Sequence, residues 1–210
     1  INLDCNRKGV NSVSYIMGQS LKPTISNGIV IGDVSMYELL DIVEQHVSHG
    51  CKRIKLKVSP RDGYERTRLV RDAYPELALA VDANQSYTYD QLDMVAAYND
   101  LNLLCIEEPF SMTNLTTYKA WKESLPNWPI TTSICLDESI LSYDDLSYAI
   151  EYRLIDVLNV KVGRLGGLIQ TRAAILRCRE AGIPYWIGSM VESGISKILH
   201  VQLAALGDTY

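Results

Sequence analysis

The sequence predicts an α/β fold in which parallel strands alternate with helices, as an incomplete (β/α) barrel or a doubly wound open sheet. Short apolar runs alternate with amphipathic segments along the 210 residues, and several runs are apolar throughout, as in parallel strands covered on both faces. Such alternation produces right-handed βαβ crossovers. The pattern contains seven strand–helix units, one fewer than a closed barrel of about 250 residues. No G-x-G-x-x-G follows the first strand, which disfavours the open sheet.

The apolar runs that predict strands are mostly bounded by turn residues or by polar side chains. In chain order they cover residues 29–31, 53–58, 77–82, 103–107, 134–137, 157–161 and 184–187. The last of these begins at Pro184.

The segments between these runs have the start and stop signals of helices. Ser35 begins a capping box with Glu38, and Gly50 stands where a helix commonly ends. Further helices are expected to begin near Asp62, to open at Thr88, and to cover 115–122, 142–151, the stretch from Gly167 to Gly182, and 195–206.

Composition and charge exclude several classes of protein. With 47% hydrophobic and 21% charged residues the chain has an ordinary globular core. A net charge of −5 provides no basic face for nucleic acid or anionic lipid, and no apolar run approaches the roughly 18 residues that span a bilayer. The five scattered cysteines contain no C-x-x-C pair and indicate buried, reduced thiols. Since no signal region is recognisable either, we expect a cytoplasmic protein, with a homo-oligomer left open.

Five consecutive predicted strands end on a charged residue. These residues are Lys57, Asp82, Glu107, Asp137 and Lys161, separated by about 24 to 30 residues each, which is the length of one βα unit. A parallel barrel brings the carboxyl ends of its strands to one rim, where barrel active sites lie. We therefore expect a catalytic site at these strand ends.

The three carboxylates predict a site for a hard cation. Asp82, Glu107 and Asp137 would place about three negative charges close together, and without a cation their repulsion would raise their pKa values. Oxygen ligands without His or Cys favour Mg²⁺ over Zn²⁺, with Mn²⁺ as a substitute. The alternative is a structural ring of salt bridges with the lysines.

Lys55 and Lys57 are separated by one residue and therefore share one face of their strand. At about 7 Å and an effective dielectric near 20, their repulsion is about 2.4 kcal/mol, which lowers a lysine pKa by roughly 1.7. We expect Lys57 to act as a general base. Lys161 lies four strands further along, on the opposite side of an eight-stranded barrel. This geometry suits removal of a proton from one face of a substrate carbon and return of a proton to the other. It also suits an elimination in which Lys161 stabilises the negative charge of the substrate.

At these residues the sequence resembles the enolase superfamily, in its muconate-lactonizing subgroup. The matches are Lys55-Leu-Lys57, Val-Asp82-Ala-Asn84, Ile-Glu107-Glu-Pro, Leu-Asp137-Glu-Ser and Asn-Val-Lys161. Two further stretches, Val162–Leu168 and Gly188–Gly194, resemble the branch of o-succinylbenzoate synthases and N-succinylamino acid racemases. The resemblance implies an incomplete (β/α) TIM-type barrel for residues 26–210, preceded by a cap remnant of residues 1–25. It also implies that most of the cap, and an eighth strand after Tyr210, are missing.

The resemblance also implies a role for each site residue. Lys57 would remove the proton α to a carboxylate of a small-molecule substrate, and Lys55 would tune the basicity of Lys57. Lys161 would act on the opposite face of the substrate carbon, as an acid, a base or a cation. The carboxylates would hold Mg²⁺, which stabilises the enediolate formed, as the superfamily's pairing of a Lys base with Mg²⁺ implies. Contacts to the substrate are expected at Asn84, Ser189 and Met190.

The reactions that this branch implies are the dehydration that forms o-succinylbenzoate in menaquinone synthesis, and the racemisation of N-succinylamino acids. Muconate cycloisomerases and dipeptide epimerases share the strand-end residues and stay as alternatives. A further alternative, from another class of protein, is a catalytically silent barrel fragment that acts as an interaction module.

Overall fold

A computed structural model describes residues 2–207 and confirms the α/β class. The chain divides into two compact units: residues Ser26–Ser139, and the residues up to Ile25 together with those from Ile140 onward. The end of the predicted barrel domain, residues 208–210, lies outside the described residues. Within the described part, no helix is both long and apolar enough to cross a membrane.

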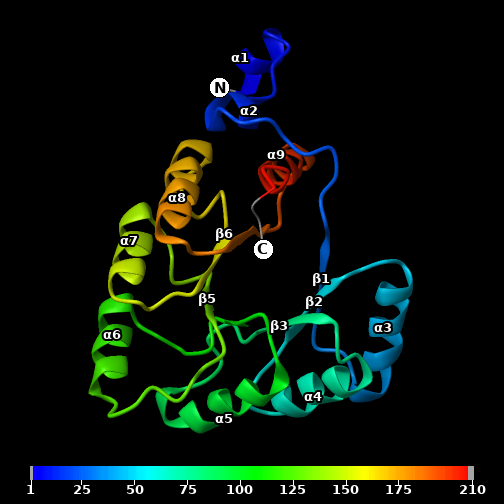
Figure 1. The fold of residues 1–210 in the computed structure, drawn as a ribbon, viewed down its shortest axis with the longest axis vertical. Coiled ribbons are helices and arrows are strands. Elements are labelled where there is room, and N and C mark those ends of the chain that lie inside the picture. The colour runs from blue at the N-terminus through cyan, green and yellow to red at the C-terminus, as the bar shows by residue number, and fades with distance from the viewer. Residues whose placement is uncertain (1, 208–210) are drawn as a thin grey trace. The chain divides into compact units, whose positions relative to one another are not determined.

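The unit of residues 26–139 is built on parallel strands paired in chain order. They are β1 (Gly28–Ile31), β2 (Arg53–Lys57), β3 (Ala78–Asp82), β4 (Ile106–Glu107) and β5 (Ile134–Leu136). The helices between and after them are α3 (Met36–Ser48), α4 (Gly63–Ala73), α5 (Leu92–Ala96) and α6 (Leu115–Ser124). Figure 1 shows α3, α4 and α5 on the same side of strands β1 to β3.

Local sequence explains how these elements begin and face the core. Ser35 caps α3 by accepting a hydrogen bond from the backbone N–H of Glu38, and Gly50 follows the helix with φ 86°, a left-handed conformation that glycine adopts easily. In β2, Ile54 and Leu56 are fully buried. The period of two in a strand therefore puts Lys55 and Lys57 together on the other face, as predicted.

The helix expected to open at Thr88 is less regular than its pattern suggests. The capping box of Thr88 and Gln91 is present, but only α5 is α-helical. Short 3₁₀ segments, η1 (Tyr89–Gln91) and η2 (Ala97–Leu101), precede and follow it. The segment ends at Asn102, which has a left-handed φ of 46°.

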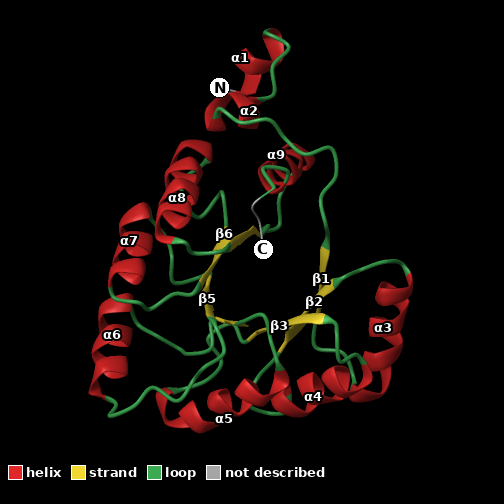
Figure 2. Ribbon diagram, in the orientation of Figure 1, coloured by secondary structure: helices red, strands yellow, loops and turns green. Residues whose placement is uncertain are grey.

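In the other unit, strands β6 (Val157–Val160) and β7 (Tyr185–Ile187) pair in parallel. Its helices are α1 (Asn2–Arg7), α2 (Ser12–Met17), α7 (Tyr143–Glu151), α8 (Leu168–Ala181) and α9 (Gly194–Ala204). Figure 2 shows how short these strands are relative to the helices and loops. Each strand of the two units lies within three residues of its predicted position.

The segment predicted as a cap remnant packs within this second unit. Helix α2 contacts α8 and α9. The Gln19 side chain donates a hydrogen bond to the carbonyl oxygen of Leu206 (2.7 Å), and the backbone N–H of Lys22 donates one to the carbonyl oxygen of Ala205 (2.7 Å). The proposed domain boundary after residue 25 stays a prediction.

The expectation of buried thiols is confirmed for four of the five cysteines. All five are free thiols, and four are buried while Cys51 is half-buried.

Candidate active site

Two lysines and two carboxylates meet at the carboxyl ends of β2, β3 and β4. Lys55 Nζ lies 3.0 Å from Asp82 Oδ2 and 2.8 Å from Glu107 Oε1. Lys57 Nζ lies 2.7 Å from Asp82 Oδ2, so that oxygen accepts from both ammonium groups. The strand register places Lys57 beside Asp82 and Asp82 beside Glu107, which explains why these side chains converge.

Asp137 follows β5 and completes the row of carboxylates. Because Glu107 pairs with Cys135, Asp137 stands two residues further along the neighbouring strand, just after β5. Asp82, Glu107 and Asp137 are 2%, 0% and 3% exposed, so all three carboxylates are buried. The negative charge of Asp137 acts on the titration of Glu107, which places the two groups within electrostatic reach.

Burial and charge shift the pKa values of Lys55, Asp82 and Glu107. Burial acts to lower the pKa of Lys55, but the charges of Glu107 and Asp82 outweigh it and raise this pKa above its ordinary value. For Asp82, burial acts to raise the pKa, but the two lysines lower it. Burial raises the pKa of Glu107 to about 7 against the effect of Lys55, and the charges of Asp82 and Asp137 add to the rise.

Repulsion between the ammonium groups was expected to lower the pKa of one of the two lysines, and for Lys55 the shift has the opposite direction. That expectation counted only the two like charges, whereas Asp82 and Glu107 lie within 3.0 Å of the Lys55 ammonium. At that distance in a buried site the attraction to two carboxylates exceeds the repulsion from the Lys57 ammonium, although the two ammonium groups share the contact with Asp82 Oδ2 and so lie closer together than the expected distance of about 7 Å.

The residues that surround this cluster suit a hard cation in their chemistry. The donors are buried carboxylate oxygens, and burial, together with the negative charges of Asp82 and Asp137, raises the pKa of Glu107 against the effect of Lys55; a bound cation would offset both causes. Within residues 2–207, however, no three acidic, histidine or cysteine side chains are grouped closely enough to hold a metal ion. Lys55 and Lys57 instead form salt bridges with Asp82, as in the alternative prediction of a structural ring of salt bridges. The donor set fits Mg²⁺, and its role as a ligand set stays a prediction.

Asn84 belongs to the same cluster, although its contacts are with protein groups. Its Oδ1 accepts a hydrogen bond from Lys57 Nζ, and its Nδ2 donates one to Glu138 Oε1 (2.8 Å). Its backbone N–H donates to Asp82 Oδ1 (3.1 Å), and its φ of 45° is left-handed, a conformation that Asn tolerates better than most residues. Asn84 therefore links the lysine expected to act as base to Glu138.

Glu108 and Glu138 were not among the predicted site residues. Glu108 is fully buried, and its carboxylate accepts hydrogen bonds from the backbone N–H groups of Asp137 (2.8 Å) and Ser139 (2.7 Å). It also accepts from Ser139 Oγ (2.8 Å) and Gln85 Nε2 (3.1 Å), so it fixes the chain on both sides of Asp137. The sequence signal was the second carboxylate directly after Glu107 and after Asp137.

Lys161, Ser189 and Met190 come together in the other unit. Lys161 Nζ donates a hydrogen bond to the carbonyl oxygen of Ser189 (3.3 Å), and Ser189 Oγ donates to that of Met190 (2.9 Å). The backbone N–H of Met190 donates to Glu192 Oε1 (3.1 Å), and Glu192 Oε2 lies 3.3 Å from His200 Nε2. Met190 is 48% exposed, so it is accessible to a ligand.

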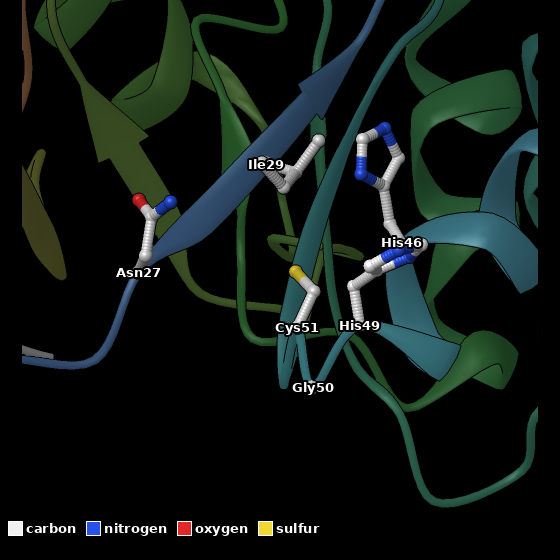
Figure 3. A pocket seen from close by; sticks show the side chains of 6 residues that line it. All are labelled: Asn27, Ile29, His46, His49, Gly50 and Cys51. Atoms are coloured by element: carbon white, nitrogen blue, oxygen red, sulfur yellow. The ribbon is translucent and has the colours of Figure 1, made fainter.

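A separate cavity of about 240 Å³ lies at the amino ends of β1 and β2, the edge opposite to the carboxylates (Figure 3). Its lining residues are Asn27, Ile29, His46, His49, Gly50 and Cys51. His49 Nδ1 lies 2.5 Å from the carbonyl oxygen of Gln45, and the Cys51 thiol donates to that of Arg53 (3.1 Å). These contacts hold both side chains to the backbone.

Comparison with known proteins identifies the family. Residues 38–208 match the Enolase C-terminal domain-like family, and the chain belongs to that family. It is 34% identical over 206 residues to the o-succinylbenzoate synthase of Geobacillus stearothermophilus, covering 98% of this chain and 53% of that protein. It is also 34% identical over 187 residues to the N-succinylamino acid racemase of Thermus thermophilus, covering 89% of this chain and 49% of that protein.

Solved structures confirm the barrel type. A probable mandelate racemase from Alicyclobacillus acidocaldarius is 30% identical, with a TM-score of 0.85 over 96% of this chain and 51% of that one. A dipeptide epimerase from Methylococcus capsulatus, solved with a Mg ion, is 25% identical, with a TM-score of 0.80 over 100% of this chain and 61% of that one. Because the chain spans about half the length of the relatives it matches, it is a partial enolase-superfamily barrel.

Proposed function

We propose that the chain is the catalytic barrel portion of a Mg²⁺-dependent enzyme that removes a proton α to the carboxylate of a small-molecule substrate. The observation that carries this proposal is the pair of lysines on one face of β2, in contact with buried carboxylates at the next strand ends. Relatives that are o-succinylbenzoate synthases and N-succinylamino acid racemases support the choice of reaction.

Each residue has a proposed part in binding or proton transfer. Asp82, Glu107 and Asp137 would hold the metal ion, for which Mn²⁺ is a substitute because it also takes oxygen ligands. Bound Mg²⁺ supplies positive charge beside the substrate carboxylate, where removal of the α-proton leaves negative charge. Ser189 and Met190 would contact the part of the substrate beyond that carboxylate.

Lys57 is the proposed base, and the two reactions diverge once the proton has been removed. The Lys57 amine takes the α-proton, and the electron pair of the broken C–H bond moves toward the substrate carboxylate. In dehydration that pair forms the new C=C bond while the adjacent C–O bond breaks, and the departing hydroxyl leaves as water with the proton returned by Lys57. In racemisation a proton returns to the same carbon from its other face, a role that we assign to Lys161.

The test is removal of the α-proton, which both reactions require, followed as exchange of that proton with solvent deuterium. The full chain is incubated with Mg²⁺ and an N-succinyl amino acid in D₂O, and the α-¹H signal of the substrate is followed by NMR. We expect the signal to decline, the decline to stop when EDTA is added, and the rate for the enantiomer whose α-proton faces Lys57 to fall at least 100-fold in Lys57→Ala, because a general base contributes about 10² to 10⁴ in rate.

Lys52→Ala is the matched control, since Lys52 is exposed and lies outside the cluster. It should exchange at the rate of the original chain. Exchange that persists for both enantiomers in Lys57→Ala, or a folded chain that shows neither exchange nor dehydration with Mg²⁺, would overturn the proposal. Parallel assays for dehydration to o-succinylbenzoate and for loss of optical rotation then separate the two reactions.

A further inference from the structure

A chain of contacts runs from Glu138 through Asn84 to Lys57. Glu138 Oε1 accepts a hydrogen bond from Asn84 Nδ2 (2.8 Å), and Asn84 Oδ1 accepts one from Lys57 Nζ. Lys57 Nζ also donates to Asp82 Oδ2 (2.7 Å). The ammonium group of Lys57 is therefore held between two oxygen acceptors, and one of them belongs to an amide whose other end is bound to Glu138.

The two ends of the Asn84 amide are not equivalent. Its oxygen only accepts hydrogen bonds and its nitrogen only donates them. Because an ionised carboxylate only accepts, Glu138 requires the amide nitrogen on its side and leaves the oxygen toward Lys57. If the amide turned over, its N–H groups would face the Lys57 ammonium, and one of the two acceptors of that group would be lost.

The backbone of Asn84 is already fixed without Glu138. Its N–H donates to Asp82 Oδ1, and the next residue, Gln85, donates its N–H to the carbonyl of Glu108 (2.7 Å). The orientation of the amide is thus the freedom that remains, and among the described residues Glu138 is the acceptor recorded for its nitrogen.

Glu138 contributes little to stability by its own contacts. Its second oxygen, Oε2, is buried and has no hydrogen-bond partner within residues 2–207. A buried carboxylate oxygen without a partner is a cost to the folded state, so loss of the half-buried Glu138 carboxylate is not expected to destabilise the fold. The presence of the Glu138 carboxylate is therefore better explained by the orientation that it gives to the Asn84 amide.

We propose that Glu138 is a positioning residue that holds the Asn84 oxygen toward Lys57 and so fixes the place of the Lys57 amine. The proposal rests on the proposed function, because the position of Lys57 affects a rate only if Lys57 transfers the α-proton. Glu138 touches neither the reacting atoms nor Lys57 and acts through Asn84 alone.

Two substitutions separate the acceptor geometry from the charge of Glu138. Glu138→Gln keeps an oxygen that can accept from Asn84 Nδ2, whereas Glu138→Leu keeps the volume and removes the acceptor. In the α-proton exchange assay with Mg²⁺, we expect Glu138→Leu to lower kcat about 10- to 100-fold with KM within about twofold. Glu138→Gln should return kcat to within about threefold of the original, and the melting temperature of Glu138→Leu should not fall.

A second measurement does not depend on turnover. The side-chain ¹⁵N–¹H₂ signal of Asn84, assigned by its absence in Asn84→Asp, should shift in Glu138→Leu and stay in place in Glu138→Gln. A chain without exchange activity in which this signal still shifts would refute the proposed function and retain the contact. An unshifted signal, an unchanged kcat in Glu138→Leu, or equal losses in both variants would overturn the positioning role.

Discussion

Gly188 provides a sharp test of how the Lys161 side chain is accommodated. It follows β7 directly, and its backbone N–H donates a hydrogen bond to the carbonyl of Val160 (2.9 Å). A Cβ atom at this position would lie 2.1 Å from Asn159 Oδ1 and 2.7 Å from Lys161 Cε. The backbone conformation itself is permitted to any residue, so Gly188→Ala perturbs these two side chains and little else.

The size of the effect follows from those distances. Ordinary contacts with a Cβ begin near 3.4 Å, so Lys161 Cε must retreat by about 0.7 Å and Asn159 Oδ1 by about 1.3 Å. Asn159 is 4% exposed and has little room to move. Overpacking of this kind costs about 1–3 kcal/mol of unfolding free energy. A displacement approaching 1 Å at a group that transfers a proton costs up to about 10²-fold in rate.

The assay combines thermal unfolding with the racemisation rate of an N-succinyl amino acid in the presence of Mg²⁺. We expect Gly188→Ala to lower the melting temperature by about 2–10 °C and kcat by about 10- to 100-fold. Gly194→Ala is the control, because a Cβ there meets nothing within 4 Å and Gly194 begins α9. Its stability should be unchanged or slightly higher. If Gly188→Ala kept both the original melting temperature and the original rate, the steric reasoning would be refuted.

Three other features of the chain give predictions of their own. Glu108→Leu should lower the free energy of unfolding, measured by urea titration, by about 2–4 kcal/mol, because four hydrogen-bond donors lose their acceptor. Glu108→Gln keeps an oxygen for the two backbone N–H groups and should lose less than half of that free energy. Mg²⁺ at about 100 times its Kd should stabilise the fold by about 2.7 kcal/mol, seen as a higher melting temperature that EDTA reverses and Asp137→Asn abolishes. At pH 8 a thiol reagent should modify the native chain at Cys51 alone, because four cysteines are buried and burial raises the pKa of Cys178 to about 12.

Each of these three has a result that contradicts it. Equal stability of the Leu and Gln variants at Glu108 would show that its hydrogen bonds contribute little. A melting temperature that Mg²⁺ leaves unchanged would remove the support for a metal site at the carboxylates. Modification of two or more thiols without unfolding would show that the core is more open than the described structure.

The sequence alone determined the features that depend on local periodicity. The alternation of apolar residues in β2 put Lys55 and Lys57 on one face, because successive side chains of any strand point to opposite sides. The spacing of charged residues by one βα unit aligned Asp82 with Lys57 and Glu107, because parallel strands keep their carboxyl ends at one edge. The caps at Ser35 and Thr88 followed from the hydrogen bonds that a first helical turn requires.

Only the tertiary structure decided which groups contact one another across strands. The pKa of Lys55 is raised rather than lowered because carboxylates from β3 and β4 lie within 3.0 Å of its ammonium group. The hydrogen bonds of Glu108 and Glu138 could not be predicted from the sequence for the same reason, since their partners are 23 to 54 residues away in the chain. Periodicity is a property of neighbours in sequence, whereas a hydrogen-bond partner or a charge at about 3 Å is set by how separate strands pair, and the linear pattern carries no record of that distance.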